Sequence, residues 1–385
     1  LARAPRLYYP TLNAAGQRIG YDRVTGATVP AVLIGAFVPG TGNTANGMVQ
    51  EGTSGFPRGL MNHQGVLFAP RLGFSYDLFG NGKTALRGGF GIVYNERERV
   101  LLLDVATTPP IQYTPIIYYG SFSTLLQSAG NLSPSSTAGL SLAGKVPTVY
   151  NYSLGIQREI GFKTVLDVAY VGALGRHLLQ LRNINTLPYG RRFLASSQDP
   201  TTGRPLSDIY LAPYPGYSSI QIDEFASSSN YHSMQVQLNR RFARGLQFAA
   251  SWTWSKSMDF ASNDWGSVAH VAPIRIWNYG KSDFDRTHIV QINWTWDIPA
   301  ATKLVKNRVV GAVADHWQLS GIASFISGAP TGVSFTALGG VDIPGGGDGV
   351  RPLVISNPIL SKSERTLARY FRTDVFAVPA VGTFG

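Results

Sequence analysis

Short segments of this chain alternate apolar residues with small or polar ones. In one of them, Leu86, Phe90 and Tyr94 fall at even positions, whereas Arg87 and Gly91 fall at odd positions. Side chains on a β-strand point to opposite faces with a period of two residues. The segment therefore predicts a strand with one apolar and one polar face. A tilted strand of about 9–11 residues is long enough to cross a lipid bilayer.

Seven further segments show the same alternation. They span residues 71–77, 150–157, 166–170, 233–239, 247–254, 290–297 and 318–325. Their polar positions mostly hold Ser, Thr, Asn, Gln and Gly, although Ile322 interrupts the pattern in the last segment. Exposed faces of soluble sheets usually carry Lys and Glu, whereas the small and neutral polar residues found here suit a crowded, hydrated lumen.

Short and long connections alternate between these predicted strands. The short connections are rich in turn-forming residues and span 79–83, 160–163 and 243–245. The long connections, of a length that is uncommon in compact domains, span 95–146, 172–230 and 255–284. Outer-membrane barrels place short turns on the periplasmic side and long loops outside. We therefore predict an all-β fold: a partial transmembrane antiparallel β-barrel with short periplasmic turns and long extracellular loops.

The regions outside and between these strands suggest a division of the chain. We expect an extracellular loop region at 1–66, barrel strands and loops at 67–338, and at 339–385 a loop leading to C-terminal strands that lie outside this sequence. A ninth strand is expected at 331–337, and the connection 299–315 is longer than the other turns. Because the chain starts at Leu1 without a signal peptide, we expect it to be part of a larger barrel.

Each face of the predicted wall carries residues with a candidate role, in the lumen on one face and at the membrane surfaces on the other. Polar residues predicted to face the lumen are Arg87, Gln157, Asp167, Gln237 and Asn293. Aromatic residues predicted to form girdles at the two membrane surfaces, where amphipathic rings are favoured, are Tyr76, Tyr94, Tyr150, Tyr152, Tyr170, Trp252, Trp254, Trp294, Trp296 and Trp317. The alternative is a soluble β-sandwich, in which the same aromatic residues would be buried in a core.

The composition of the chain favours a membrane barrel over a soluble protein. Only 14% of the residues are charged, compared with about 25% in a typical soluble protein. No apolar run is long enough for a transmembrane helix. The net charge of +11 comes from Lys and Arg scattered over turns and loops. We therefore expect contact with outer-membrane lipid and no binding of nucleic acid.

Sequence signals for catalysis and metal binding are weak. The segment 80–84 ends in Gly-Lys-Thr, but a phosphate-binding loop requires a glycine where Asp77 stands. The six histidines lack the spacing of metal ligands, and Asp342 and Asp348 lack the spacing of a calcium loop. We therefore expect no enzyme activity, no cofactor and no metal site.

Several of these segments resemble one family of membrane proteins. The runs are 69–77 (APRLGFSYD), 80–84 (GNGKT), 86–91 (LRGGFG), 150–155 (YNYSLG), 169–172 (AYVG), 239–242 (NRRF), 251–257 (SWTWSKS) and 284–288 (FDRTH). They are similar to TonB-dependent outer-membrane receptors of the Oar-like branch, over roughly residues 66–335. The resemblance implies a barrel of roughly 22 strands, an N-terminal plug and ligand import powered by the TonB complex. The plug and the TonB-binding segment would lie outside this sequence.

Aromatic residues in the predicted loops are candidates for ligand binding. They are Tyr118, Tyr119, Tyr214, Tyr217, Trp265, Trp277 and Tyr279. Their rings could stack on a sugar, a peptide or a chelate; the alternative is that they pack loop against loop. The sequence does not identify the ligand. A passive porin and a surface protein with a structural or adhesive role remain the alternatives to a transporter.

Overall fold

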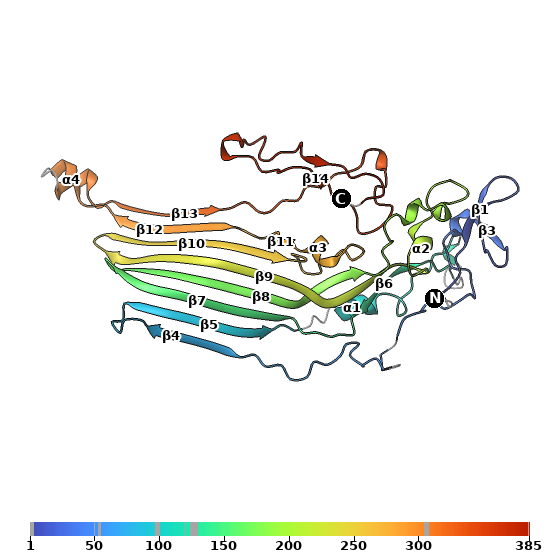
Figure 1. The fold of residues 1–385 in the computed structure, drawn as a ribbon, viewed down its shortest axis with the longest axis horizontal. Helices are drawn as coiled ribbons and strands as arrows, with labels where there is room; N and C mark the ends of the chain where they lie inside the picture. The colour runs from blue at the N-terminus through green and yellow to red at the C-terminus, as the bar shows by residue number, and fades with distance from the viewer. Residues whose placement is uncertain are drawn as a thin grey trace.

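The computed structural model describes residues 4–49, 51–52, 55–96, 101–118, 120–123, 130–303, 308–383 and 385. Its main feature is one large sheet with long loops gathered at one end (Figure 1). Within these residues, no helix combines the length and the apolar character needed to span a membrane.

The large sheet is an antiparallel meander, in which strands that follow one another along the chain lie side by side. Its strands, in spatial order, are β4 (Arg71–Asp77), β5 (Thr84–Tyr94), β7 (Thr148–Gly161), β8 (Thr164–Asn183), β9 (Tyr217–Ala243), β10 (Leu246–Asp259), β12 (His288–Asp297) and β13 (Gln318–Ile326). All the segments that were predicted from alternation are strands of this sheet. The prediction of an antiparallel all-β fold is confirmed.

The cross-strand register aligns apolar side chains in rows across the sheet. Register partners on neighbouring strands point to the same face. One row contains, strand by strand, Tyr76, Leu86, Ile156, Val168, Val236, Trp252, Val290 and Phe325. Every member of this row is apolar or aromatic, so the alternation seen in each segment becomes a continuous apolar face.

The opposite face is polar in the same systematic way. The neighbouring row contains Asp77, Ala85, Gln157, Asp167, Gln237, Ser251, Gln291 and Ser324. A shift of the register by one residue on any strand would mix the two sets. The observed register therefore separates an apolar face, here called the outward face, from a polar face, here called the inward face.

Apolar side chains of the outward face are left exposed by the described residues. Leu154, Ile156 and Val168 are 53%, 47% and 37% exposed, respectively. In a β-sandwich these side chains would be buried against a second sheet. The buried apolar cluster of the described residues instead lies in the loops and consists of Leu187, Leu206, Leu211 and Ala212. An uncovered apolar face is what lipid requires of a barrel wall, and the sandwich alternative is rejected.

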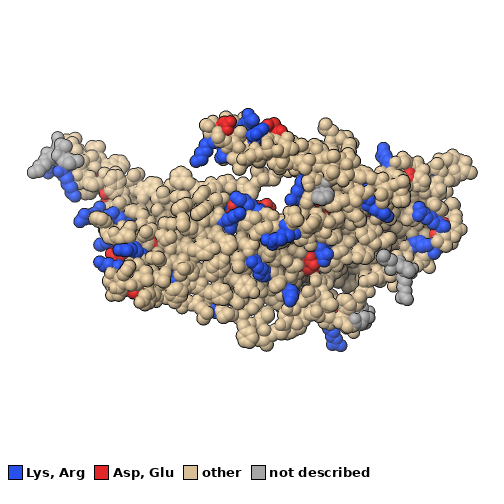
Figure 2. Space-filling view, viewed as in Figure 1, with Lys and Arg blue, Asp and Glu red and all other residues tan. Residues whose placement is uncertain are grey.

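The two ends of the sheet differ as the connections predicted. The tight turns after β4, β7 and β9 lie at one end, together with the β12–β13 connection, which contains η5 (Ala301–Lys303) and α4 (Arg308–Ala314) (Figure 1). The long connections lie at the other end. Charged side chains on the visible face gather at the turn end and toward the loops, and few lie over the part of the sheet between them (Figure 2).

This arrangement predicts at which end of the sheet an introduced cysteine reacts with a reagent added outside the cell. The chain contains no cysteine, so a single introduced cysteine reports one position. In the full-length protein, Asn263→Cys in a long connection should react with a membrane-impermeant maleimide on intact cells. Asn81→Cys in the β4–β5 turn should react only after the outer membrane is opened. Both side chains are exposed, so accessibility is matched. Labelling of Asn81→Cys on intact cells would show that the orientation is the opposite of the predicted one.

Two strands extend far beyond the length needed to cross a bilayer. β8 has 20 residues and β9 has 27, compared with about 9–11 for a crossing. The predicted loop 172–230 is therefore wrong at both ends, because its flanks continue the β8–β9 ladder as far as the pair Asn183 and Gln221. β6 (Ser135–Leu140) pairs in parallel with this extension of β9. The extension therefore continues the sheet among the loops.

The remaining elements are short and lie in the connecting regions. A small sheet in the first region joins β1 (Tyr9–Leu12), β2 (Arg18–Tyr21) and β3 (Thr28–Pro30), and a second pairs β14 (Leu353–Val354) with β15 (Phe376–Ala377). The others are η1 (Ala31–Leu33), α1 (Leu101–Ala106), η3 (Arg191–Phe193), η4 (Ala195–Ser197), α2 (Asp208–Leu211), α3 (Ile274–Asn278), β11 (Gly280–Lys281), η6 (Leu338–Gly340) and η7 (Lys362–Glu364).

The ninth strand predicted at 331–337 is not formed. A strand needs a hydrogen-bonded neighbour, because its backbone donors and acceptors are otherwise unpaired. Among the described residues β13 is the last strand on that edge of the sheet. The β12–β13 ladder ends at the pair Ile289 and Ile326, and the segment 331–337 beyond it pairs with no described strand and follows an irregular path.

Candidate functional site

The inward face collects the residues that the sequence predicted to face the lumen. Gln157, Asp167 and Gln237 are consecutive register partners in the polar row described above. Arg87 pairs with Ser75 and Gly155 in the adjoining row, and Asn293 pairs with Ala249 on the same face. All five therefore share one surface. Its neutral amides and few charges could form hydrogen bonds with a passing polar ligand.

The predicted girdle residues lie on the outward face. Those within strands, namely Tyr76, Tyr94, Tyr150, Tyr152, Tyr170, Trp252, Trp254, Trp294 and Trp296, share the parity of the apolar row, and Trp317 directly precedes β13. Tyr76 lies next to the β4–β5 turn, yet its row partner Trp252 lies well inside β10. Rows perpendicular to tilted strands cross the membrane obliquely. That these rings form two girdles stays a prediction.

Glycines in the wall make room for the large rings of the outward face. The ring of Tyr152 lies across β8 over Gly172, where an added Cβ would overlap the ring carbons. Phe74 over Gly88 and Trp294 over Gly321 repeat this arrangement. Only a residue without a Cβ allows such close approach. Glycines inside these strands therefore serve ring packing on the outward face.

Two histidines join the outward aromatic residues. The hydroxyls of Tyr170 and Tyr152 lie 2.7 and 3.3 Å from Nδ1 of His232. Trp252 Nε1 donates to Nδ1 of His288 at 3.3 Å. A buried or lipid-facing polar ring is stabilised by such a partner. These histidines therefore belong to the outer surface of the wall and not to a site on the inward face.

The loop aromatics that were predicted to bind ligand do not form one site. Tyr214 and Tyr217 line a pocket between loops, and the Tyr217 hydroxyl donates to the carbonyls of Thr44 and Asn46. Arg351 covers the Trp277 ring at 4.2 Å.

The other loop aromatics are dispersed as well. Tyr279 contacts Phe260 and Arg275. Tyr118 is exposed, and Tyr119 lies outside the described residues. The sequence could not show that these loops diverge, because loop contacts are not periodic. Trp265 alone lines the pocket described next.

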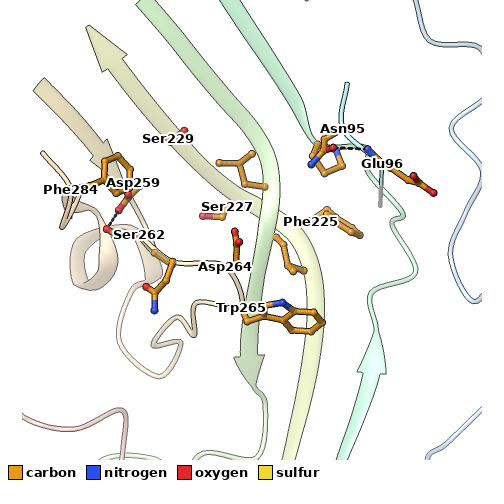
Figure 3. A pocket seen from close by; sticks show the side chains of 15 residues that line it. Asn95, Glu96, Phe225, Ser227, Ser229, Asp259, Ser262, Asp264, Trp265 and Phe284 are labelled. Carbon is orange, nitrogen blue, oxygen red and sulfur yellow. Dashed lines mark hydrogen bonds between the residues drawn. The ribbon is translucent and has the colours of Figure 1, made fainter. Parts of the chain in front are cut away.

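A polar pocket opens where the inward face meets the long connections (Figure 3). It has a volume of about 240 Å³, and its walls come from β8, β9, the end of β10 and the loop that follows. Ser229 and Asp259 are register partners on the inward face and form its floor. Asp264 brings a second carboxylate from the loop after β10, whereas the Glu96 side chain, which also lines the pocket, points away from the other labelled side chains in Figure 3. The pocket therefore lies at the loop end of the polar surface.

The same pocket has an apolar side. Trp265 and Phe225 lie on this side, and Phe284 lines the pocket from the opposite side (Figure 3). Trp265 adopts φ 61°, a left-handed conformation that is unfavourable for a bulky residue. Such outliers concentrate at functional sites. The Asp259 carboxylate accepts a hydrogen bond from the Ser262 hydroxyl at 3.0 Å, which holds the loop against the end of β10.

Sequence reasoning found Trp265 but missed the carboxylates around it. Asp259 ends β10 and Asp264 lies in the loop that follows, so their approach depends on the path of that loop, which no sequence period reveals. The loop aspartates considered from the sequence have other contacts. Asp348 accepts hydrogen bonds from the backbone N–H groups of 270–272, and Asp342 accepts one from Arg192. Both carboxylates therefore hold loops together.

Comparisons with known proteins add the following. A family model described as the outer membrane beta barrel domain matches residues 14–385. A search of curated proteins gave no match. Among solved structures, the chain is similar to the outer membrane transporter YddB from Escherichia coli, with 12% identity and a TM-score of 0.36 over 58% of this chain and 25% of that one.

Two siderophore receptors are also similar. PirA from Pseudomonas aeruginosa has 12% identity and a TM-score of 0.28 over 60% of this chain and 31% of its own. PirA from Acinetobacter baumannii has 12% identity and a TM-score of 0.30 over 67% of this chain and 33% of its own. The present chain thus spans a third or less of the length of these three structures.

Proposed function

Because this chain belongs to the outer membrane β-barrel domain family and thus to the bacterial outer membrane, we propose that it forms wall strands and extracellular loops of a TonB-dependent transporter that imports a polar ligand. The polar pocket at the loop end of the inward face is the observation that carries this proposal. A barrel wall alone needs no such pocket. A transporter needs a place where the ligand is captured before it enters the lumen.

The pocket chemistry indicates the class of ligand. Two carboxylates, Asp259 and Asp264, favour groups that donate hydrogen bonds or carry positive charge. The Trp265 and Phe225 rings favour a flat or apolar portion. A hydroxyl- or amine-bearing ligand of modest size, such as a glycan fragment or a cationic peptide, combines both. Below the pocket, the amides of Gln157 and Gln237 continue the polar surface.

The coupling to the TonB complex rests on the resemblance of the strand motifs, such as 86–91 and 251–257, to TonB-dependent receptors. A wide barrel must be closed by a plug to keep the membrane tight, and moving that plug requires work. The plug and the contact with TonB would lie in parts of the protein beyond these residues. Binding at the pocket is therefore expected to be independent of TonB, and accumulation is expected to depend on it.

Depletion of the growth medium tests the proposal and identifies the ligand in the same experiment. Cells that express the full-length protein are grown on a mixture of oligosaccharides and peptides, and mass spectrometry follows which compounds disappear. We expect a specific subset to be depleted, and the depletion to stop when the TonB complex is deleted. Trp265→Ala should slow uptake at low concentration by roughly two- to tenfold, the equivalent of a lost aromatic contact of about 0.5–1.5 kcal/mol.

Trp277→Ala is the matched control, because the structure places Trp277 against Arg351 and away from the pocket. It should leave uptake unchanged. Equal depletion with and without the TonB complex would identify a passive porin. No depletion, with retained surface binding of cells to a partner, would favour an adhesive protein. Either result would overturn active import.

A further inference from the structure

The outward face carries a second pocket, whose position differs from that of the ligand pocket. It has a volume of about 350 Å³ and is lined by Tyr170, His232, Ser233, Met234, Trp254, Ser255, Lys256, Lys281 and Thr287. Tyr170, Met234 and Trp254 are register partners on the apolar face. In the assembled barrel this pocket would face lipid and not the lumen. A transported ligand has no reason to occupy it.

Two ammonium groups lie at the outer rim of this pocket. Along β10, Trp252, Trp254 and Lys256 follow one another on the outward face. The surface therefore changes from aromatic to basic toward the loop end of the strand. Lys281 on β11 pairs with Met258, one row further out on the same face. Both lysines are exposed. They therefore stand where the apolar band of the wall meets the membrane surface.

The charges of this rim are unbalanced. The lining contains both ammonium groups and no carboxylate. Lys281 contacts the buried Asp285 carboxylate at 3.5 Å, whereas Lys256 forms no ion pair with any described residue. The neighbouring His232 accepts or shares hydrogen bonds with Tyr170 and Tyr152 and adds no negative charge. A bound anion would balance the positive charge of the lysines at this rim.

The apolar part of the pocket adds a second requirement. Trp254 and Tyr170 are 52% and 46% exposed, and Met234 lies between them. A small hydrated anion would leave these surfaces uncovered, whereas an acyl chain would cover them. The occupant that matches both parts is an amphiphile with an anionic headgroup above and a hydrocarbon chain below. In the outer leaflet of this membrane, that description fits a phosphorylated glycolipid.

We propose that this pocket is a lipid site, in which Lys256 and Lys281 bind a phosphate group of an outer-leaflet glycolipid while Tyr170, Met234 and Trp254 hold one of its acyl chains. Lys side chains suit this task because their long stems lie along apolar surface while the ammonium reaches the headgroups. The site would anchor the wall beside the long β8–β9 extension. It is independent of the transport proposal, because it uses only the outward face.

Native mass spectrometry of the full-length protein in detergent tests the site. The protein is titrated with bisphosphorylated lipid A, with its monophosphorylated form, with phosphatidylglycerol and with inorganic phosphate. We expect lipid A to bind most tightly, the monophosphorylated form to bind more weakly and saturating inorganic phosphate not to displace it. Equal affinity for phosphatidylglycerol would overturn the assignment to a glycolipid. Equal occupancy by inorganic phosphate would overturn the lipid site altogether.

Variants locate the binding. Lys256→Gln and Lys281→Gln should each weaken lipid A binding roughly fivefold, and the double variant about 25-fold, which corresponds to about 1 kcal/mol for each basic residue at a membrane surface. Lys256→Arg keeps the charge and should bind as the unchanged protein does. Lys163→Gln, in the β7–β8 turn at the opposite end of the wall, is the control and should have no effect. Unaltered lipid A affinity in the double variant would contradict the proposal.

Discussion

Arginine at Ile156 is expected to prevent most of the full-length protein from folding in the outer membrane. Ile156 lies near the middle of β7, belongs to the apolar row and is 47% exposed on the outward face. An arginine that faces lipid at the middle of a bilayer costs roughly 2–4 kcal/mol. The expected result is loss of the compact, heat-modifiable form on unheated electrophoresis, together with degradation of the unfolded chain.

The neighbouring position supplies the control. Gln157 precedes the β7–β8 turn by almost the same distance but belongs to the polar row of the inward face. Gln157→Arg should therefore leave most of the protein folded, because the guanidinium can reach water in the lumen. The comparison isolates the effect of the face, because the strand, the depth and the introduced arginine are the same in both variants. Equal tolerance of both variants would contradict a lipid-facing wall.

Replacing Asp223 by asparagine is expected to stabilise the β8–β9 extension at neutral pH. Asp223 lies on β9 far from the β9–β10 turn, outside the membrane part, and its side chain is fully buried. Gln221 donates to one carboxylate oxygen at 2.9 Å, and the other oxygen has no hydrogen-bond partner in the described structure. Burial, with a smaller contribution from the charge of Asp104, raises the pKa of Asp223 to about 6.

The sign of the pH dependence follows from that shift. The folded extension holds the Asp223 proton more tightly than the unfolded chain, so its stability falls as the pH rises from about 4 to about 6 and is constant above. In Asp223→Asn this dependence should disappear, and the free energy of opening at pH 7 should rise by up to about 3 kcal/mol. Hydrogen exchange of β8 and β9 amides, corrected for intrinsic rates, measures both effects.

Asp22 gives the opposite expectation under the same substitution. Its carboxylate accepts hydrogen bonds from Arg6 at 2.9 and 3.1 Å, and this guanidinium holds the pKa of Asp22 well below its usual range. The ionised form therefore stabilises the first region above pH 4, and the contribution is lost as the pH falls. Asp22→Asn should increase exchange in β1–β3 at neutral pH. If Asp223→Asn also increased exchange in its own strands, the burial argument would be wrong.

The wall was predictable because its pattern is local. Each crossing strand alternates with a period of two residues, and each tight turn carries its own glycine or asparagine, as in 79–83. A lipid-facing wall must keep apolar side chains on one face along its whole length, so the alternation is clean where the chain meets lipid. For the same reason, the parity that separated Gln157 and Asp167 from Tyr152 and Tyr170 in the sequence also separates them in space.

The alternation of apolar and polar residues does not extend over the full length of β8 and β9. Beyond the residues that alternate, β8 and β9 continue through Leu178-Leu179 and Ser227-Ser228-Ser229, which do not alternate. Both faces of this extension contact loops or water, so no single period is imposed on its residues, and two register shifts change the parity. The sequence therefore predicted loops where the structure continues two strands. The segment 331–337 failed in the opposite way, since it alternates but pairs with no described strand.

The sites depend on tertiary structure for a related reason. Sequence alone separated the residues of the two faces of the sheet, because the face on which a side chain lies is a property of one strand. It could not bring Asp259 to Trp265, or Lys281 to the rim above Trp254, because these groups come from segments whose approach depends on the strand register and the path of the loops. Period and turn chemistry are local and are written in each segment. The residues of a pocket come from several segments, and only the packing of the sheet and its loops brings those segments together.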